Sequence, residues 1–138
     1  MGACCGGRPV DEEINNAKDI NEIIQIFEGR INKLPEERKE LKEYLDDPTK
    51  QVGNLNLNDV DPEWIKKRIP HLENLEDAFG KVVDILKSNP ELPLKDVKSY
   101  SSNVAQHYLK FYDVNDALKT DLDNMESFVN KWKSDNAH

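Results

Sequence analysis

The sequence predicts an all-α fold, a compact or elongated bundle of four to six amphipathic helices behind a flexible N-terminal arm. Apolar residues recur every three or four positions along most of the chain. Hydrophobic residues make up only 37% and charged residues 33%, which suits helices that keep one wide face in water. A length of 138 residues fits one domain. We therefore expect residues 1–10 to form the arm and residues 11–138 to form a single helical-bundle domain.

The first confident helix is predicted to begin at Asp19. Asp19 is a capping residue type, and Glu22 follows three positions later as in a capping box. Apolar side chains then repeat at helical spacing at Ile20, Ile23, Ile24, Phe27, Ile31 and Leu34. This pattern indicates one amphipathic helix.

A second helix is predicted to carry Pro35 in its first turn and to end near Pro48. Residues 50–62 alternate Leu55 and Leu57 with asparagines, as a strand would. Because a single strand has no partner, we expect a loop there.

Two separate helices are predicted on either side of Pro70. A short one opens at Pro62 and carries Trp64, and Pro70 is expected to close it. The next is expected to end at the Ser88–Pro90 stop, after a stripe formed by Leu72, Leu75, Phe79, Val82, Val83 and Leu86.

The last part of the chain carries two apolar stripes whose connection is left open. The first consists of Val97, Tyr100, Val104, Tyr108 and Phe111, and the second of Leu118, Leu122, Met125, Val129 and Trp132. Asp113 and Asp116 are suited to cap a new helix between them, and one helix through residues 94–133 is equally compatible. The second stripe resembles a coiled-coil seam but covers barely two heptads, so we favour ordinary bundle core.

Charge and composition exclude several classes of partner. The formal net charge of −8 disfavours attraction to nucleic acid and to anionic lipid surfaces. No apolar run approaches the ~20 residues of a membrane span, and the start lacks the pattern of a secretory signal. The two cysteines are adjacent and cannot staple the fold, which fits a reducing compartment. We expect a cytoplasmic protein.

No pattern of catalytic or metal-binding residues is found. The serines lie at expected helix ends or on polar faces, outside any G-x-S-x-G motif. The histidines fall in different segments without zinc-site spacing. We expect His71 to cap a helix start, His107 to be a half-buried packing residue and His138 to be mobile.

Calcium and phosphate sites also lack their motifs. From Asp113, the sixth position of a calcium loop is Leu118 and the twelfth is Asn124, where that loop needs Gly and Glu. The glycines after the N-terminal arm stand alone, without a phosphate-binding motif. We expect a non-enzymatic protein with no cofactor, no metal and no small-molecule substrate.

The segment "MGACCGG", residues 1–7, carries most of the functional information. Removal of Met1 exposes Gly2, the residue type that accepts N-myristoylation. The segment resembles the N-termini of dually acylated cytosolic proteins, and this resemblance implies palmitoylation of Cys4 and Cys5. Gly6 departs from the usual pattern, which prefers Ser or Thr at that position.

A second membrane signal is required, because one myristoyl chain binds a bilayer only marginally, with a constant of about 10⁴ M⁻¹. Basic residues cannot supply it, since Arg8 and Lys18 are outnumbered by nearby acidic residues. Palmitate on Cys4, Cys5 or both is the remaining candidate. The alternatives are a chance Met-Gly start with inert cysteines and a metal or redox role for the cysteine pair.

The leading hypothesis is a lipid-anchored adaptor on the cytosolic face of a membrane, with a helical bundle for protein–protein interaction. Trp64, Met125 and Trp132 are weaker candidates for the partner-binding surface, because aromatic residues and Met are enriched at interfaces. The rival hypothesis is a small structural subunit of a filament or multi-subunit complex.

Overall fold

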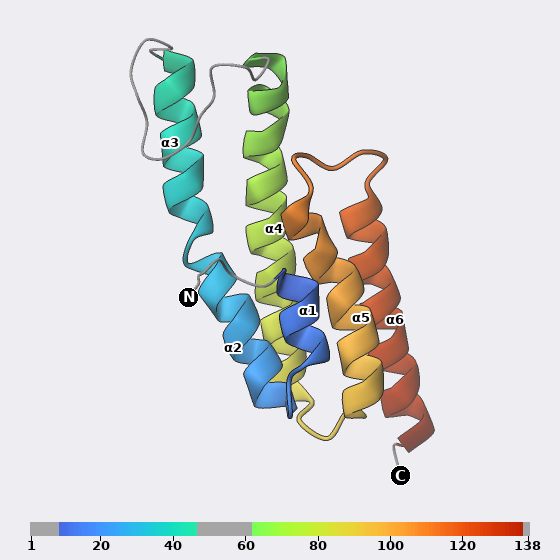
Figure 1. The fold of residues 1–138 in the computed structure, drawn as a ribbon. Coiled ribbons are helices and arrows are strands. Elements are labelled where there is room, and N and C mark those ends of the chain that lie inside the picture. The colour runs from blue at the N-terminus through green and yellow to red at the C-terminus, as the bar shows by residue number, and fades with distance from the viewer. Residues whose placement is uncertain (1–8, 47–61, 137–138) are drawn as a thin grey trace.

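The computed structural model describes residues 9–46 and 62–136 and confirms the all-α bundle. These residues form α1 (Val10–Asn15), α2 (Ile20–Ile31), α3 (Leu34–Asp46), α4 (Pro62–Ser88), α5 (Leu94–Ala105), the 3₁₀ helix η1 (Gln106–Leu109) and α6 (Ala117–Asn136). The described ranges contain no strand (Figure 1). Most of the predicted arm, the predicted loop and His138 lie outside them.

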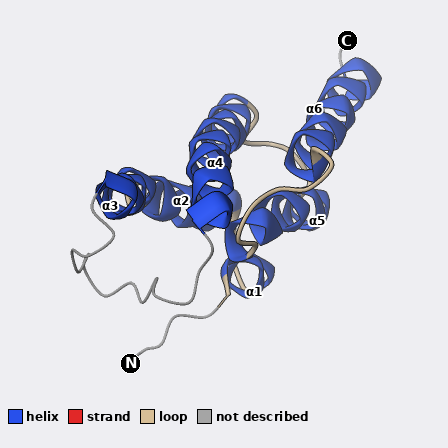
Figure 2. Cartoon of the chain, turned by 90° about the horizontal axis from the view of Figure 1, so that it is seen from above, coloured by secondary structure: helices blue, strands red, loops and turns tan. Residues whose placement is uncertain are grey.

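Helix α4 is the centre of the bundle. It packs against α2 and α3 on one side and against α5 and α6 on the other, and α1 lies against α5 (Figure 2). The apolar stripes meet in one core, in which Phe27 and Phe79 are fully buried edge to face, with ring centroids 4.9 Å apart. Within the described ranges, no helix has the length and the apolar run needed to cross a bilayer.

The predicted capping of α2 is confirmed. The Asp19 Oδ1 atom accepts a hydrogen bond from the Glu22 backbone N–H at 2.9 Å. The Glu22 carboxylate accepts in turn from the Lys18 N–H at 3.3 Å, one residue earlier than in a standard capping box. These two hydrogen bonds stabilise the first turn of α2.

Helix α1 was not predicted, and its first residue, Val10, falls in the range expected to be a flexible arm. Val10 begins α1 and is fully buried, as is Ile14. A helix of six residues carries too few apolar positions to show a period. Glu13 holds it in place through an ion pair of 2.8 Å with Arg30 of α2.

The expectation of two helices divided at Pro70 is wrong, because α4 runs without interruption from Pro62 to Ser88. Proline removes the hydrogen bond to the carbonyl of Lys66, four residues earlier. Pro70 and Lys66 are both exposed, so water can satisfy that carbonyl. Burial of Ile65 and Leu72 on either side holds the helix together across the gap.

The sequence left open whether residues 94–133 form one helix or two, and the structure shows two, α5 and α6. Asn115 and Asp116 adopt left-handed backbone conformations, with φ of 65° and 54°, which no helix continues. Asp113 caps α6, since its Oδ2 atom accepts from the Leu118 N–H at 3.3 Å. Phe111 therefore lies outside both helices and is not part of a helical stripe.

Candidate interaction surface

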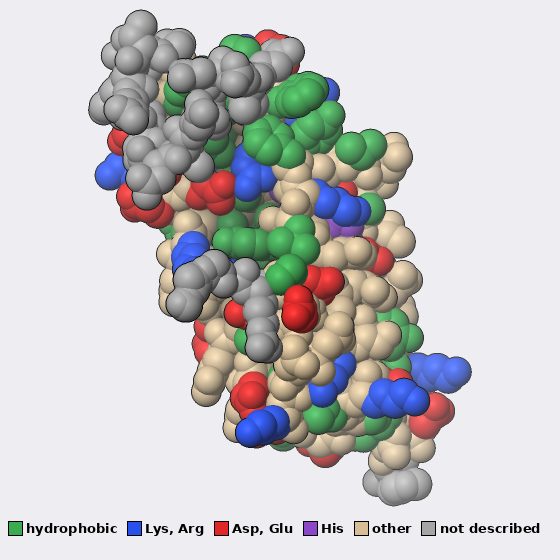
Figure 3. Space-filling model, in the orientation of Figure 1, with side chains coloured by type: hydrophobic (Ala, Val, Ile, Leu, Met, Phe, Trp, Pro, Cys, Tyr) green, Lys and Arg blue, Asp and Glu red, His purple; other side chains and the backbone are tan. Residues whose placement is uncertain are grey.

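Large exposed apolar side chains gather at one end of the described structure. They are Trp64 at 50% exposure, Leu109 at 55%, Phe111 at 37% and Val114 at 56%. Trp64 comes from the first turn of α4, and the other three come from the end of η1 and the segment before α6. We call these four residues the apical patch. Figure 3 shows apolar side chains gathered at this end of the molecule.

Arg68 of α4 fixes the backbone of the patch. Its Nη1 atom donates to the carbonyls of Lys110 and Phe111, at 3.1 and 2.7 Å. Its Nη2 atom donates to Glu37 Oε1 of α3 at 2.7 Å, and its guanidinium lies 4.8 Å from the centroid of the Phe111 ring. One side chain thus joins α3, α4 and the segment that carries Phe111 and Val114.

A second cation and a tight turn complete the arrangement. Lys67 Nζ lies 5.2 Å from the centroid of the Tyr112 ring, next to Phe111. The left-handed pair Asn115 and Asp116 then reverses the chain into α6. Val114 directly precedes this turn and is exposed at the surface.

Replacing Arg68 with lysine is expected to loosen the patch. An ammonium lacks the planar fork that serves two carbonyls and Glu37 at once, so we expect a loss of about 1–2 kcal/mol in the free energy of unfolding. Urea unfolding gives that loss, and hydrogen exchange should accelerate at the Lys110 amide, which donates to the His107 carbonyl in the segment that Arg68 holds. The control Lys67→Arg keeps a cation over Tyr112 and should leave both measurements unchanged. Wild-type exchange rates in Arg68→Lys would contradict the role of Arg68.

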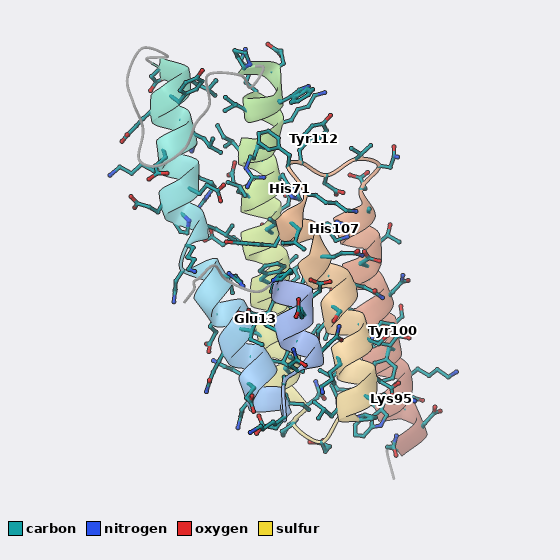
Figure 4. The ribbon with its side chains drawn as sticks, viewed as in Figure 1. Glu13, His71, Lys95, Tyr100, His107 and Tyr112 are labelled. Atoms are coloured by element: carbon teal, nitrogen blue, oxygen red, sulfur yellow. The ribbon has the colours of Figure 1, made fainter. Side chains whose placement is uncertain are left out.

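A polar chain of two buried histidines and the partly exposed Asp121 joins α4, η1 and α6. His71 Nε2 lies 2.9 Å from the His107 carbonyl oxygen, which can only accept, so Nε2 donates. His107 Nε2 lies 2.6 Å from Asp121 Oδ2 of α6. Both imidazoles are 1% exposed, and Figure 4 shows them on α4 and η1, below Tyr112. We call His71, His107 and Asp121 the histidine chain.

The histidine chain corrects two expectations. His71 lies inside α4 and does not cap a helix start, and His107 is fully buried. Burial lowers the pKa of His71 below its ordinary value of 6.5, and the nearby Arg68 also lowers it. The His107 carbonyl and the Asp113 carboxylate act in the opposite direction and raise this pKa. A neutral His71 is therefore the form that the fold accommodates.

Acidification is expected to destabilise the protein through His71. Because its pKa is lower in the folded chain, the unfolded chain binds more protons below pH 6.5. The contribution of neutral His71 is complete above that pH and is lost as the pH falls, by at most about 1.4 kcal/mol per pH unit. Urea unfolding at several values between neutral and mildly acidic pH measures this loss of stability. The variant His71→Gln retains a donor for the carbonyl, and its free energy of unfolding should fall less steeply as the pH decreases. An unchanged pH dependence would show that His71 is not its source.

The residues predicted as sites fall in three different places. Gly2, Cys4 and Cys5 lie outside the described residues. Trp64 belongs to the apical patch, whereas Met125 is 1% exposed and lies in the core. Trp132 is half-buried against the core near the C-terminal end of α6, far along the chain from the patch.

Three of the four patch residues were not predicted from the sequence to lie at a surface site. Phe111 continues an apolar stripe and so resembles a core residue, and Leu109 and Val114 carry no pattern of their own. A usable signal was the cluster of aromatic and aliphatic residues directly before the Asn115–Asp116 turn. In the described ranges, no three His, Cys, Asp or Glu side chains are grouped so that they could hold a metal ion.

Comparison with known proteins gives no match to a family model, to a curated protein or to a solved structure.

Proposed function

We propose that this chain is a non-enzymatic membrane adaptor. Acyl chains on Gly2 and on Cys4 or Cys5 hold it at the cytosolic face of a membrane, and the helical bundle is its interaction module. The observation that carries the role of the bundle is the apical patch, in which four large apolar side chains are 37–56% exposed. Contiguous exposed apolar side chains mark interaction sites on soluble domains.

The patch is held in place before any contact is made. Arg68 and the histidine chain tie its segment to α3, α4 and α6. A surface that is already ordered loses little conformational entropy on binding, which favours affinity. This rigidity supports an interaction surface and distinguishes it from a frayed chain segment.

Intact mass of the protein from its native cell, with and without hydroxylamine, tests the anchor. Hydroxylamine cleaves thioesters and leaves amide-linked myristate in place. The expected mass lacks Met1, carries a myristoyl group and falls on treatment by the mass of one or two palmitoyl groups. An unmodified N-terminus would overturn the anchored adaptor and favour the structural subunit.

A further inference from the structure

The first described helix, α1, lies beside the segment that leads into the apical patch. Helix α1 packs against η1, and η1 ends at the patch residue Leu109. Figure 1 shows the chain entering α1 at the end that faces the apical end. Seven peptide steps separate Gly2 from Pro9, which gives a reach of about 25 Å. Acyl chains on the first residues can therefore enter a bilayer that the apical patch also touches.

The patch has the side-chain chemistry of a membrane interface. Trp64 in the patch and Tyr112, which follows the patch residue Phe111, combine an apolar ring with a polar group, as residues at the headgroup level do. Leu109 and Val114 supply aliphatic groups, each more than half exposed. Residues of this kind enter the boundary between headgroups and acyl chains to a depth of about 5–10 Å.

Charge next to the patch residues permits such an approach although the chain carries a net charge of −8. Among the described residues that are near the patch residues in sequence or bonded to their segment, the basic ones are Lys66, Lys67, Arg68 and Lys110, and the acidic ones are Glu37, Glu63, Asp113 and Asp116. Their formal charges cancel. The carboxylate of Glu63 pairs with Lys66, and that of Glu37 pairs with Arg68. Lys67 and Lys110 are exposed, and their long side chains can reach lipid phosphates.

From this placement we infer that the apical patch rests on the lipid headgroup region of the membrane that holds the acyl chains. The inference depends on the proposed anchoring and identifies the neighbour of the patch as lipid. The patch then fixes the orientation of the bundle, and the acyl chains supply the binding energy.

The two tryptophans allow this orientation to be measured. Trp64 lies in the patch, and Trp132 lies near the opposite end of α6. Trp132→Phe leaves Trp64 as the reporter, and Trp64→Phe leaves Trp132 as its matched control. The full chain is coupled through Cys4 and Cys5, its two cysteines, to maleimide lipid in phosphatidylcholine–phosphatidylserine vesicles. This coupling places the bilayer where palmitate would place it.

Brominated acyl chains in these vesicles should quench Trp64 about twofold, because an interfacial ring lies near the first methylenes. Trp132 emission should stay within error of that in vesicles without bromine. The double variant Leu109→Ser with Val114→Ser, made in the Trp132→Phe chain, should lower Trp64 quenching to the Trp132 level. Since both replaced side chains are more than half exposed, its urea unfolding should match that of its parent.

Three results would overturn the inference. Absence of quenching at Trp64 would show that the patch faces away from lipid and would direct the search to a protein partner. Equal quenching of both tryptophans would show a bundle without fixed orientation. A concentration-dependent blue shift of Trp64 without vesicles would assign the patch to a second copy of this chain. Because the coupling is chemical, none of these results bears on native acylation, which the intact mass tests separately.

Discussion

Gly2→Ala is expected to move the protein from the membrane fraction to the soluble fraction of its native cell. Alanine at this position does not accept myristate. Under the proposed anchoring, the brief membrane residence given by myristate, with a constant of about 10⁴ M⁻¹, brings Cys4 and Cys5 to the membrane where they would be acylated. Without myristoylation the protein should carry neither myristate nor palmitate. The added methyl group of alanine should therefore abolish membrane binding. Fractionation with immunodetection measures the effect.

Two further variants separate the contributions of the two acyl chains. Cys4→Ser with Cys5→Ser keeps myristate and should give weak binding that is lost on washing. Ala3→Ser keeps Gly2 and both cysteines and should fractionate as the wild type does. A Gly2→Ala protein that remained in the membrane fraction would refute the lipid anchor, although the bundle would be unaffected.

Phe79→Ala is expected to destabilise the bundle by about 3–5 kcal/mol. The Phe79 ring is fully buried, lies edge-on to Phe27 of α2 and stacks on Tyr108 of η1 at a centroid distance of 6.3 Å. Its removal leaves a cavity where α2, α4 and η1 meet. Because domains of this size are stable by only about 5–15 kcal/mol, a large share of stability should be lost. Urea or thermal unfolding followed by circular dichroism measures it.

Phe111→Ala is the matched control for that substitution. It removes the same ring from a site that is 37% exposed, over Arg68. We expect a loss below about 1.5 kcal/mol, since the ring is partly exposed and its ring contacts are with the Arg68 cation and the Tyr112 ring. A loss at Phe111 equal to that at Phe79 would mean that the patch is a part of the core.

Local spacing predicted most of the fold because it reflects interactions between near neighbours. The Asp19 cap and the Phe27 stripe depend on residues three or four positions apart. The same spacing left open whether a helix ends near Asp113, although Asp113 was a capping candidate. The continuity of α4 depends on a balance that the sequence does not show. Pro70 weakens the helix locally, and contacts with α2 and α3 hold it in place.

The surface was harder to predict than the core because exposure depends on distant residues. A helical period shows that Met125 faces one side, but neighbouring helices decide that this side is covered. Phe111 is held outside the helices by Arg68, which lies 43 positions earlier in the chain. Trp64 was identified because its residue type is common at interfaces, and no pattern in the sequence joined it to Leu109 or Val114.

The uneven burial along α4 has a consequence for the order of folding. Of the buried side chains on this helix, Ile65 alone precedes Pro70, and the others, from His71 to Leu86, follow it. The segment after Pro70 is therefore suited to form the folding nucleus with α2, and the apical end adds later. Substitutions at Trp64 or Ile65 should then change the rate of unfolding, with little effect on the rate of folding. The part of the bundle that carries the candidate surface is the last to assemble and the first to separate.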